Sequence, residues 1–219
     1  MNQLTNKKEN KRIKVITGIR RSGKSYLLND IYYNYLIFLG VSSKRIIRIK
    51  LDELSSVKYR NPLYLNEFIN SSINNNDMHY IFIDEIQLVE RIKNPYIDTE
   101  NNYIGFYDIL NELLSKDNVD VYVTGSNSKM LSRDALTEFR GRGNQIHISL
   151  LSFGKFSSIN KKSFNEAYSE YQLYGGLPYV ALLESEEDKI NSFHRFLNYL
   201  LIQYFDGLVP NNSFVLVNQ

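Results

Sequence analysis

Short apolar runs alternate with amphipathic stretches along the first two thirds of the chain. Runs of β-branched and aromatic residues predict strands, and apolar residues repeated every three or four positions predict helices. Strands are expected at residues 13–17, 46–51, 80–83, 119–123 and 145–150, and helices at 24–39, 62–73, 106–115 and 128–139. This alternation predicts an α/β fold in which a mainly parallel sheet of five strands lies between helices.

Beyond residue 150 the pattern becomes helical. Helices are expected at residues 164–174 and 186–205, with a break at Gly175-Gly176-Leu177-Pro178 between them. Earlier in the chain, residues 91–105 are polar and predict a long loop. We therefore predict two domains, a core over residues 1–155 and a small helical C-terminal segment over residues 156–219.

The strongest chemical signal is the motif Gly18-Ile19-Arg20-Arg21-Ser22-Gly23-Lys24-Ser25. It matches G-x-x-x-x-G-K-[ST], the P-loop pattern, between a predicted strand and a predicted helix. Glycines let the backbone curl so that successive N–H groups face phosphate oxygens, and the helix N-terminus adds a favourable dipole. Lys24 is expected to reach the β- and γ-phosphates, and Ser25 to bind Mg²⁺. We assign residues 18–25, together with Tyr26, to nucleotide binding.

Two acids, Asp84 and Glu85, follow the apolar run Tyr80-Ile81-Phe82-Ile83. In P-loop proteins an acid at the end of such a strand supports Mg²⁺, and a neighbouring glutamate polarises the attacking water. We predict that Asp84 binds the metal and that Glu85 is the general base. Acids are also common where a buried strand reaches solvent, so this assignment depends on the presence of the P-loop.

Composition and charge exclude several classes of protein. The chain has no cysteine and only three scattered histidines, so disulfides and a thiolate or histidine metal cluster are excluded. With 26 basic and 24 acidic residues the formal net charge is +2, which gives no support for nucleic-acid binding. No run approaches the roughly 20 apolar residues that a membrane-spanning helix needs. We therefore expect a cytoplasmic protein without a membrane partner.

Several separated motifs together resemble one family, the AAA-type ATPases of the group AAA_14, which are often joined to a DUF4143 region. The resemblance runs from about residue 12 to residue 206. Besides the P-loop, the motifs that carry it are Asp84-Glu85-Ile86-Gln87, Val123-Thr124-Gly125-Ser126-Asn127-Ser128, Phe139-Arg140-Gly141-Arg142, Leu150-Leu151-Ser152-Phe153 and Tyr174-Gly175-Gly176-Leu177-Pro178. It implies ATP as the nucleotide and a lid-like role for the helical C-terminal segment. Nothing in the motifs themselves selects adenine.

The resemblance also implies roles for two further pairs of residues. Ser126 or Asn127 would be a polar sensor of the γ-phosphate, although an ordinary polar turn is the plain alternative. Arg140 or Arg142 would be an arginine finger that acts in a neighbouring subunit of a homo-oligomer, although a solvated arginine fits the sequence nearly as well.

Members of this family usually continue well past the last predicted helix, so we expect this chain to be a truncated product or a fragment. The leading hypothesis is Mg²⁺-dependent ATP hydrolysis, and the alternative is an ATP-controlled switch or scaffold with negligible turnover. A small-molecule kinase would use the same P-loop. Glu85 and the motif Thr124-Gly125-Ser126-Asn127 argue against it, because a kinase has no use for a residue that activates water.

Overall fold

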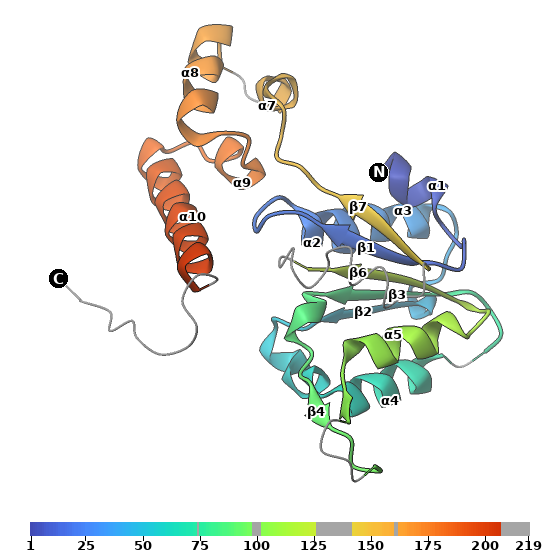
Figure 1. Ribbon diagram of the computed structural model, residues 1–219. Helices are drawn as coiled ribbons and strands as arrows, with labels where there is room; N and C mark the ends of the chain where they lie inside the picture. The colour runs from blue at the N-terminus through green and yellow to red at the C-terminus, as the bar shows by residue number, and fades with distance from the viewer. Residues whose placement is uncertain (74, 98–101, 126–141, 160–161, 207–219) are drawn as a thin grey trace. The chain divides into compact units, whose positions relative to one another are not determined.

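The computed structural model describes residues 1–73, 75–97, 102–125, 142–159 and 162–206 (Figure 1). It divides into two compact units, Met1–Ser149 and Leu150–Gln219. The first unit therefore ends before the boundary that the sequence analysis set after residue 155. Leu151, and Phe153 at the start of α7 (Phe153–Ile159), explain the difference, because both pack against a hydrophobic cluster of the second unit that contains the buried Phe156.

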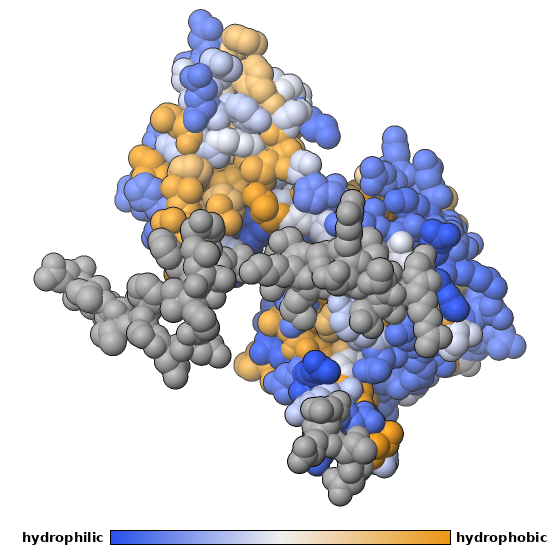
Figure 2. Space-filling model, in the orientation of Figure 1, coloured by the Kyte–Doolittle hydropathy of each residue, from blue (hydrophilic) through white to orange (hydrophobic). Residues whose placement is uncertain are grey.

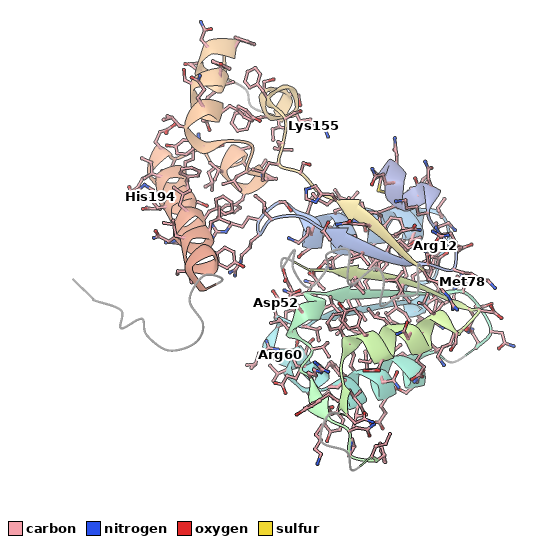
Figure 3. The ribbon with its side chains drawn as sticks, viewed as in Figure 1. Arg12, Asp52, Arg60, Met78, Lys155 and His194 are labelled. Atoms are coloured by element: carbon pink, nitrogen blue, oxygen red, sulfur yellow. The ribbon has the colours of Figure 1, made fainter. Side chains whose placement is uncertain are left out.

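The first unit is built on a parallel sheet of five strands, which confirms the predicted fold class. The strand order is β2-β3-β6-β1-β7, and every neighbouring pair is parallel. The strands are β2 (Ile46–Lys50), β3 (His79–Asp84), β6 (Val119–Thr124), β1 (Ile13–Thr17) and β7 (Gly143–His147). Their carboxyl ends meet at one edge of the sheet. Arg12 and Met78, which precede β1 and β3, lie at the opposite edge (Figure 3).

Helices cover both faces of this sheet (Figure 1). On one face lie α4 (Pro62–Ser72) and α5 (Phe106–Leu114). On the other lies a continuous helical segment made of α2 (Lys24–Tyr26), a π-helical stretch Leu27–Tyr32 and α3 (Tyr33–Phe38). Successive strand residues point to alternate faces, so each central strand contributes side chains to the hydrophobic core on both faces of the sheet. The central strands are buried on both sides, which explains their almost uninterrupted apolar sequence.

The N-terminal segment contributes to the core, which the sequence analysis did not predict. Residues before β1 are mostly polar, yet the short helix α1 (Asn2–Asn6) buries Leu4 completely against the face covered by α3. A helix of five residues with one buried side chain gives no periodic signal.

A buried ion pair joins β1 to β6 under this segment. The side chains of Lys14 and Asp120 are 0% and 1% exposed and form a direct salt bridge. Tyr122 Oη donates to Asp120 Oδ2 over 2.7 Å, and the backbone N–H of Glu9 donates to the same oxygen over 2.8 Å. Burial lowers the pKa of Lys14, and the charge of Asp120 opposes that effect. Because these bonds satisfy the carboxylate, the charge pair is tolerated inside the sheet.

One other region differs from the sequence predictions. The stretch predicted as a loop over residues 91–105 contains a small antiparallel ribbon, β4 (Ile92–Lys93) with β5 (Tyr103–Ile104). Strands of two residues are too short to show an alternating pattern of apolar and polar positions. The helix predicted at residues 128–139 lies outside the described residues.

The second unit consists of α7, α8 (Phe164–Tyr174), α9 (Pro178–Ala181) and α10 (Glu186–Asp206). Glycine is required at position 176, in the break between α8 and α9, because a Cβ there would lie 1.9 Å from the carbonyl oxygen of Leu151. Figure 2 shows many apolar residues on the visible face of this unit. Its exposed apolar side chains include Leu173, Tyr179, Leu182, Leu197 and Leu201. Within the described parts of the chain, no helix combines the length and apolar character needed to cross a membrane.

The buried ion pair gives a stability prediction. Asp120→Ala leaves the Lys14 ammonium buried without its partner, and such a loss costs about 3–5 kcal/mol. We expect a clearly lower urea midpoint for unfolding. The matched control is Asp117→Ala, which removes an ion pair with Lys11 whose side chains are 87% and 74% exposed, and should leave the midpoint near wild type. Equal losses in the two variants would contradict the role given to Asp120.

Candidate functional site

The predicted nucleotide-binding loop connects β1 to α2 at the carboxyl edge of the sheet. Three of its residues have positive φ angles: Gly18 at 149°, Arg21 at 65° and Gly23 at 92°. Gly23 is also the residue at which the helix begins. These angles turn the backbone into a tight loop that ends on a helix N-terminus, the arrangement that binds phosphate through main-chain N–H groups.

Gly18 is fixed by close contact as well as by its angle. A Cβ atom there would lie 2.4 Å from the carbonyl oxygen of Ile148 and 2.9 Å from Ser22 Oγ. Ile148 follows β7, and its N–H donates to the carbonyl oxygen of Thr17 over 2.7 Å. The first residue of the loop is therefore held against the chain that leaves the edge strand. Only glycine fits at this position.

Lys24 lies beneath the loop with 4% of its surface exposed. Its Nζ donates to the carbonyl oxygens of Gly18 and Ile19, each over 2.9 Å. An ammonium group has three donors, and these bonds use two of them. Burial lowers the pKa of Lys24, while the charges of Glu85 and Asp84 oppose that effect. The side chain thus brings a positive charge to the inner side of the loop.

The other side chains of the loop divide into buried and exposed groups. Ser22 is 4% exposed, and its Oγ has no hydrogen-bond partner within the described structure. An unpaired buried hydroxyl beside curled main-chain N–H groups suits a phosphate oxygen. Exposed side chains belong to Ile19, Arg20, Arg21 and Tyr26. Tyr26 is 64% exposed, so its ring adds nothing to the buried part of the site.

Asp84, the last residue of β3, is the centre of the hydrogen-bond network. It is 2% exposed. Its Oδ1 accepts from Ser25 Oγ over 3.0 Å and from Thr124 Oγ1, and its Oδ2 accepts from Asn29 Nδ2 over 3.2 Å. The two residues predicted to bind the metal, Ser25 and Asp84, are therefore in direct contact. Thr124 and Asn29 had no predicted role.

Burial sets the electrostatics of this carboxylate. Burial raises the pKa of Asp84, and the hydrogen bonds from Thr124 and Ser25 oppose part of that rise. The charges of Glu85 and Asp52 act in the same direction as burial. Asp52 follows β2 at the same edge of the sheet (Figure 3). A cation placed here would relieve both the desolvation of Asp84 and the repulsion from its acidic neighbours.

Glu85 has an unusual backbone conformation. Its φ of 57° lies in the left-handed region, which costs a residue with a Cβ about 1–2 kcal/mol. The backbone N–H donates to Thr124 Oγ1 over 3.0 Å, and the carboxylate accepts from Gln87 Nε2. Thr124 therefore links the backbone of Glu85 to the side chain of Asp84. Strained residues of this kind concentrate at functional sites.

The oxygen ligands present here fit Mg²⁺. A serine hydroxyl and a carboxylate are hard ligands, and Mg²⁺ typically uses one or two such protein groups together with phosphates and water. Across the described ranges, no group of three histidine or acidic side chains forms a separate metal site. The hydroxyl of Ser25 and the carboxylate of Asp84 are the two groups here that could hold the ion.

The predicted sensor and arginine finger are only partly visible. Ser126, Asn127 and Arg140 lie outside the described residues. Arg142 is exposed, and its carbonyl oxygen accepts from the N–H of Ile13 over 2.9 Å. Because Ile13 begins β1 and the loop follows its carboxyl end, Arg142 lies at the opposite edge of the sheet from the loop. The structure does not bring it together with the other predicted residues.

The two residues that were missed carry weak but readable signals. Asn29 stands four positions after Ser25, one helical turn along the predicted helix, a spacing that places two side chains on one helix face. Thr124 is the last residue of a predicted central strand, at the same edge as Asp84. These two positions are the signals by which Asn29 and Thr124 could have been found.

Comparisons with known proteins agree with this geometry. Residues 10–157 match the sequence model of AAA_14, described as an AAA domain. An uncharacterized protein of Haemophilus influenzae is 33% identical over 190 residues, covering 84% of this chain and 44% of that protein. The uncharacterized protein MJ1544 of Methanocaldococcus jannaschii is 29% identical over 213 residues, covering 90% and 41%. The chain thus spans less than half the length of these two relatives.

A solved structure shares the fold. The structure of C. elegans PCH-2 superposes with a TM-score of 0.53 at 14% sequence identity, covering 90% of this chain and 63% of that one. At this identity the likeness concerns the fold alone.

The contact at Gly18 gives a prediction with an internal control. Gly18→Ala places a methyl group against the backbone of Ile148, and overpacking of this kind costs about 1–3 kcal/mol beyond the strain of the positive φ. Gly40→Ala has the same class of strain, with a φ of 85°, but no atom lies within 4 Å of its Cβ. In urea denaturation Gly18→Ala should lose more stability than Gly40→Ala. Equal losses would show that the close contact is unimportant.

Proposed function

The chain belongs to the AAA_14 family of AAA domains, and from this premise we propose that it binds ATP with Mg²⁺ in the loop Gly18–Ser25 and hydrolyses it. The observation that carries the proposal is the direct bond between Ser25, at the start of the P-loop helix, and Asp84, at the end of β3. A chance glycine turn has no reason to place the motif serine on a buried strand-terminal carboxylate.

Phosphate binding rests on the loop and the helix that follows it. Main-chain N–H groups, the buried hydroxyl of Ser22 and the ammonium of Lys24 provide donors and positive charge for the β- and γ-phosphates. None of these groups reads the base. The choice of ATP over GTP is supported by family membership alone.

Ser25 and Asp84 would hold Mg²⁺, and the bound ion would supply positive charge that offsets the charge developing on the phosphates. Glu85 is next in the chain to Asp84, and in this proposal its carboxylate accepts a proton from the attacking water. The bond from its N–H to Thr124 fixes the backbone that carries this base. Water attack releases ADP and inorganic phosphate.

A second candidate function is an ATP-controlled switch or scaffold with negligible turnover. Arg142 lies away from the loop of its own chain, so an isolated copy would lack the contribution of this arginine and would behave as such a switch. If catalysis needs an arginine from a neighbouring subunit, an isolated copy would be slower by roughly 10³ to 10⁵. A homo-oligomer that supplies this arginine is part of the hydrolysis proposal.

Binding is tested by the effect of MgATP on thermal stability. At 100 times Kd, ATP should stabilise the fold by about 2.7 kcal/mol, which corresponds to a rise in Tm of roughly 5 to 10 °C. Lys24→Ala should abolish this rise because it removes the buried ammonium. The control is Lys44→Ala, which changes an exposed lysine before β2 and should leave the rise intact. Absence of any rise in the wild type would refute nucleotide binding.

Hydrolysis is tested by phosphate release from MgATP over a wide range of protein concentration. Glu85→Gln should keep the thermal rise but lower turnover by about 10² to 10⁴, the usual contribution of a general base. The same change at the exposed Glu90 should have little effect. Turnover per molecule that increases with concentration would support an arginine supplied in trans. Negligible wild-type turnover at every concentration, despite tight binding, would favour the switch.

A further inference from the structure

The helix that follows the P-loop is interrupted by a π-helical stretch, Leu27–Tyr32. At its end the N–H of Tyr33 bonds to the carbonyl oxygen of Leu28, five residues earlier. Such stretches are rare and are found mostly at functional sites. The π-helical stretch begins two residues after the predicted metal ligand Ser25, and it places one side chain in the site.

That side chain is Asn29, which is 4% exposed. Ser25 and Asn29 lie four residues apart and reach the same carboxylate from one helix face. Ser25 Oγ bonds to Oδ1 of Asp84 over 3.0 Å, and Asn29 Nδ2 bonds to Oδ2 over 3.2 Å. Both oxygens are therefore held by donors from the P-loop helix. A carboxylate bonded at both oxygens loses its freedom to rotate about the bond that carries it.

The orientation of the Asn29 amide follows from its partner. An ionised carboxylate only accepts hydrogen bonds, so the NH₂ group must face Asp84. The amide oxygen Oδ1 then faces away from it, buried and without a hydrogen-bond partner within the described structure. An unpaired buried acceptor costs about 1–3 kcal/mol, so its retention points to a ligand or water that pairs with it.

The backbone of Asn29 is held from a neighbouring strand. Arg48 on β2 donates from Nη1 to the carbonyl oxygen of Asn29 over 3.2 Å. Its guanidinium also stacks on the ring of Tyr33, with 4.0 Å between Cζ and the ring centroid. A π-helical turn disturbs the regular ladder of helix bonds, and Arg48 supplies an outside donor at that point. Two elements, the P-loop helix and β2, therefore hold Asn29 in place.

We propose that Asn29 is a positioning residue for Mg²⁺: its amide N–H holds the Asp84 carboxylate in one orientation, and its unpaired Oδ1 would accept from a water of the hydrated ion. This inference rests on the proposed binding of MgATP. Mg²⁺ keeps several waters when bound to proteins, so an acceptor near its carboxylate ligand has a partner of the right chemistry. Residues that orient metal ligands typically change metal affinity by 10- to 100-fold when replaced.

The experiment compares Asn29→Leu with wild type in two titrations of a fluorescent ATP analogue, one with Mg²⁺ and one with EDTA. Mn²⁺ binding to the nucleotide-loaded protein, followed by electron paramagnetic resonance, gives a readout independent of turnover. We expect the variant to keep its Mg²⁺-free nucleotide affinity within about twofold, and to lose about 10-fold or more in the metal-dependent increase and in Mn²⁺ affinity.

Asn70→Leu is the matched control. Asn70 lies on α4, its Nδ2 donates to Glu112 Oε1 over 2.9 Å, and its Oδ1 is also buried without a partner in the described parts of the chain. It shares the chemistry of Asn29 but lies on the other face of the sheet. Replacing it should alter stability without altering metal dependence. Asn29→Ala, which places no apolar bulk against Asp84, is used if Asn29→Leu does not fold.

The outcomes separate this inference from the proposed function. If the wild type binds no nucleotide in either titration, nucleotide binding itself fails and the role of Asn29 falls with it. If the wild type shows metal-dependent binding and the Asn29 variants match it, the inference alone is overturned. Equal loss of affinity with and without Mg²⁺ would also overturn it, because that pattern describes a residue that only supports the loop.

Discussion

The burial of the Asp84 carboxylate is the constraint on which the site depends. A charge at the end of a central strand loses its hydration and must be compensated by nearby donors. Those donors come from Ser25 and Asn29 on the P-loop helix and from Thr124 on β6. Because one carboxylate needs all three, the loop, β3 and β6 can be arranged in few ways. The need to compensate the buried charge of Asp84 thereby sets the geometry at the carboxyl ends of these strands.

At the amino-terminal ends of β1 and β6 the charges are reversed, because the group that must be compensated is a buried cation. There a buried cation on β1, Lys14, is compensated by Asp120 on β6. Strands β1 and β6 therefore each connect an ionic cluster in the core to a component of the site. Neighbouring parallel strands with fixed polar bonds at both ends cannot slide past one another without breaking them. This register fixes the distance between Thr124 and the first residue of the P-loop.

The sequence was sufficient for the fold because long, strongly patterned elements determine it. The strand Ile13–Thr17 and the helix Phe164–Tyr174 lie where they were predicted, since each has apolar residues at the spacing of its element. Predictions failed for short elements, α1 and the ribbon of β4 and β5, which bury too little to leave a pattern. The edge strand β7 was placed about two residues too late, at 145–150 instead of Gly143–His147. Its polar first residues, paired on one side only, resemble a loop.

For the site, spacing predicted which residues lie in the loop, and strand order explains the contact of Ser25 with Asp84. The roles given to these residues remain predictions. Asn29 and Thr124 could not be assigned, because each acts through its bond to Asp84. That residue is 55 positions from Asn29 and 40 from Thr124, and only the folded sheet brings them into contact. The left-handed backbone of Glu85 could not be predicted either, because glycine and asparagine are the residues that usually mark a positive φ. A sequence motif can therefore predict which chemistry a site performs, whereas the hydrogen bonds between its side chains can be known only from the fold.

The N-terminal segment shows that the first residue matched by the family model is not the first residue of the folded core. The family match begins at residue 10, yet Leu4 is fully buried and Glu9 donates its N–H to the buried carboxylate of Asp120. A fragment cut where the match begins would uncover apolar surface and remove a donor from a charged group in the core. The start of the family match therefore does not mark the first residue that the folded core needs.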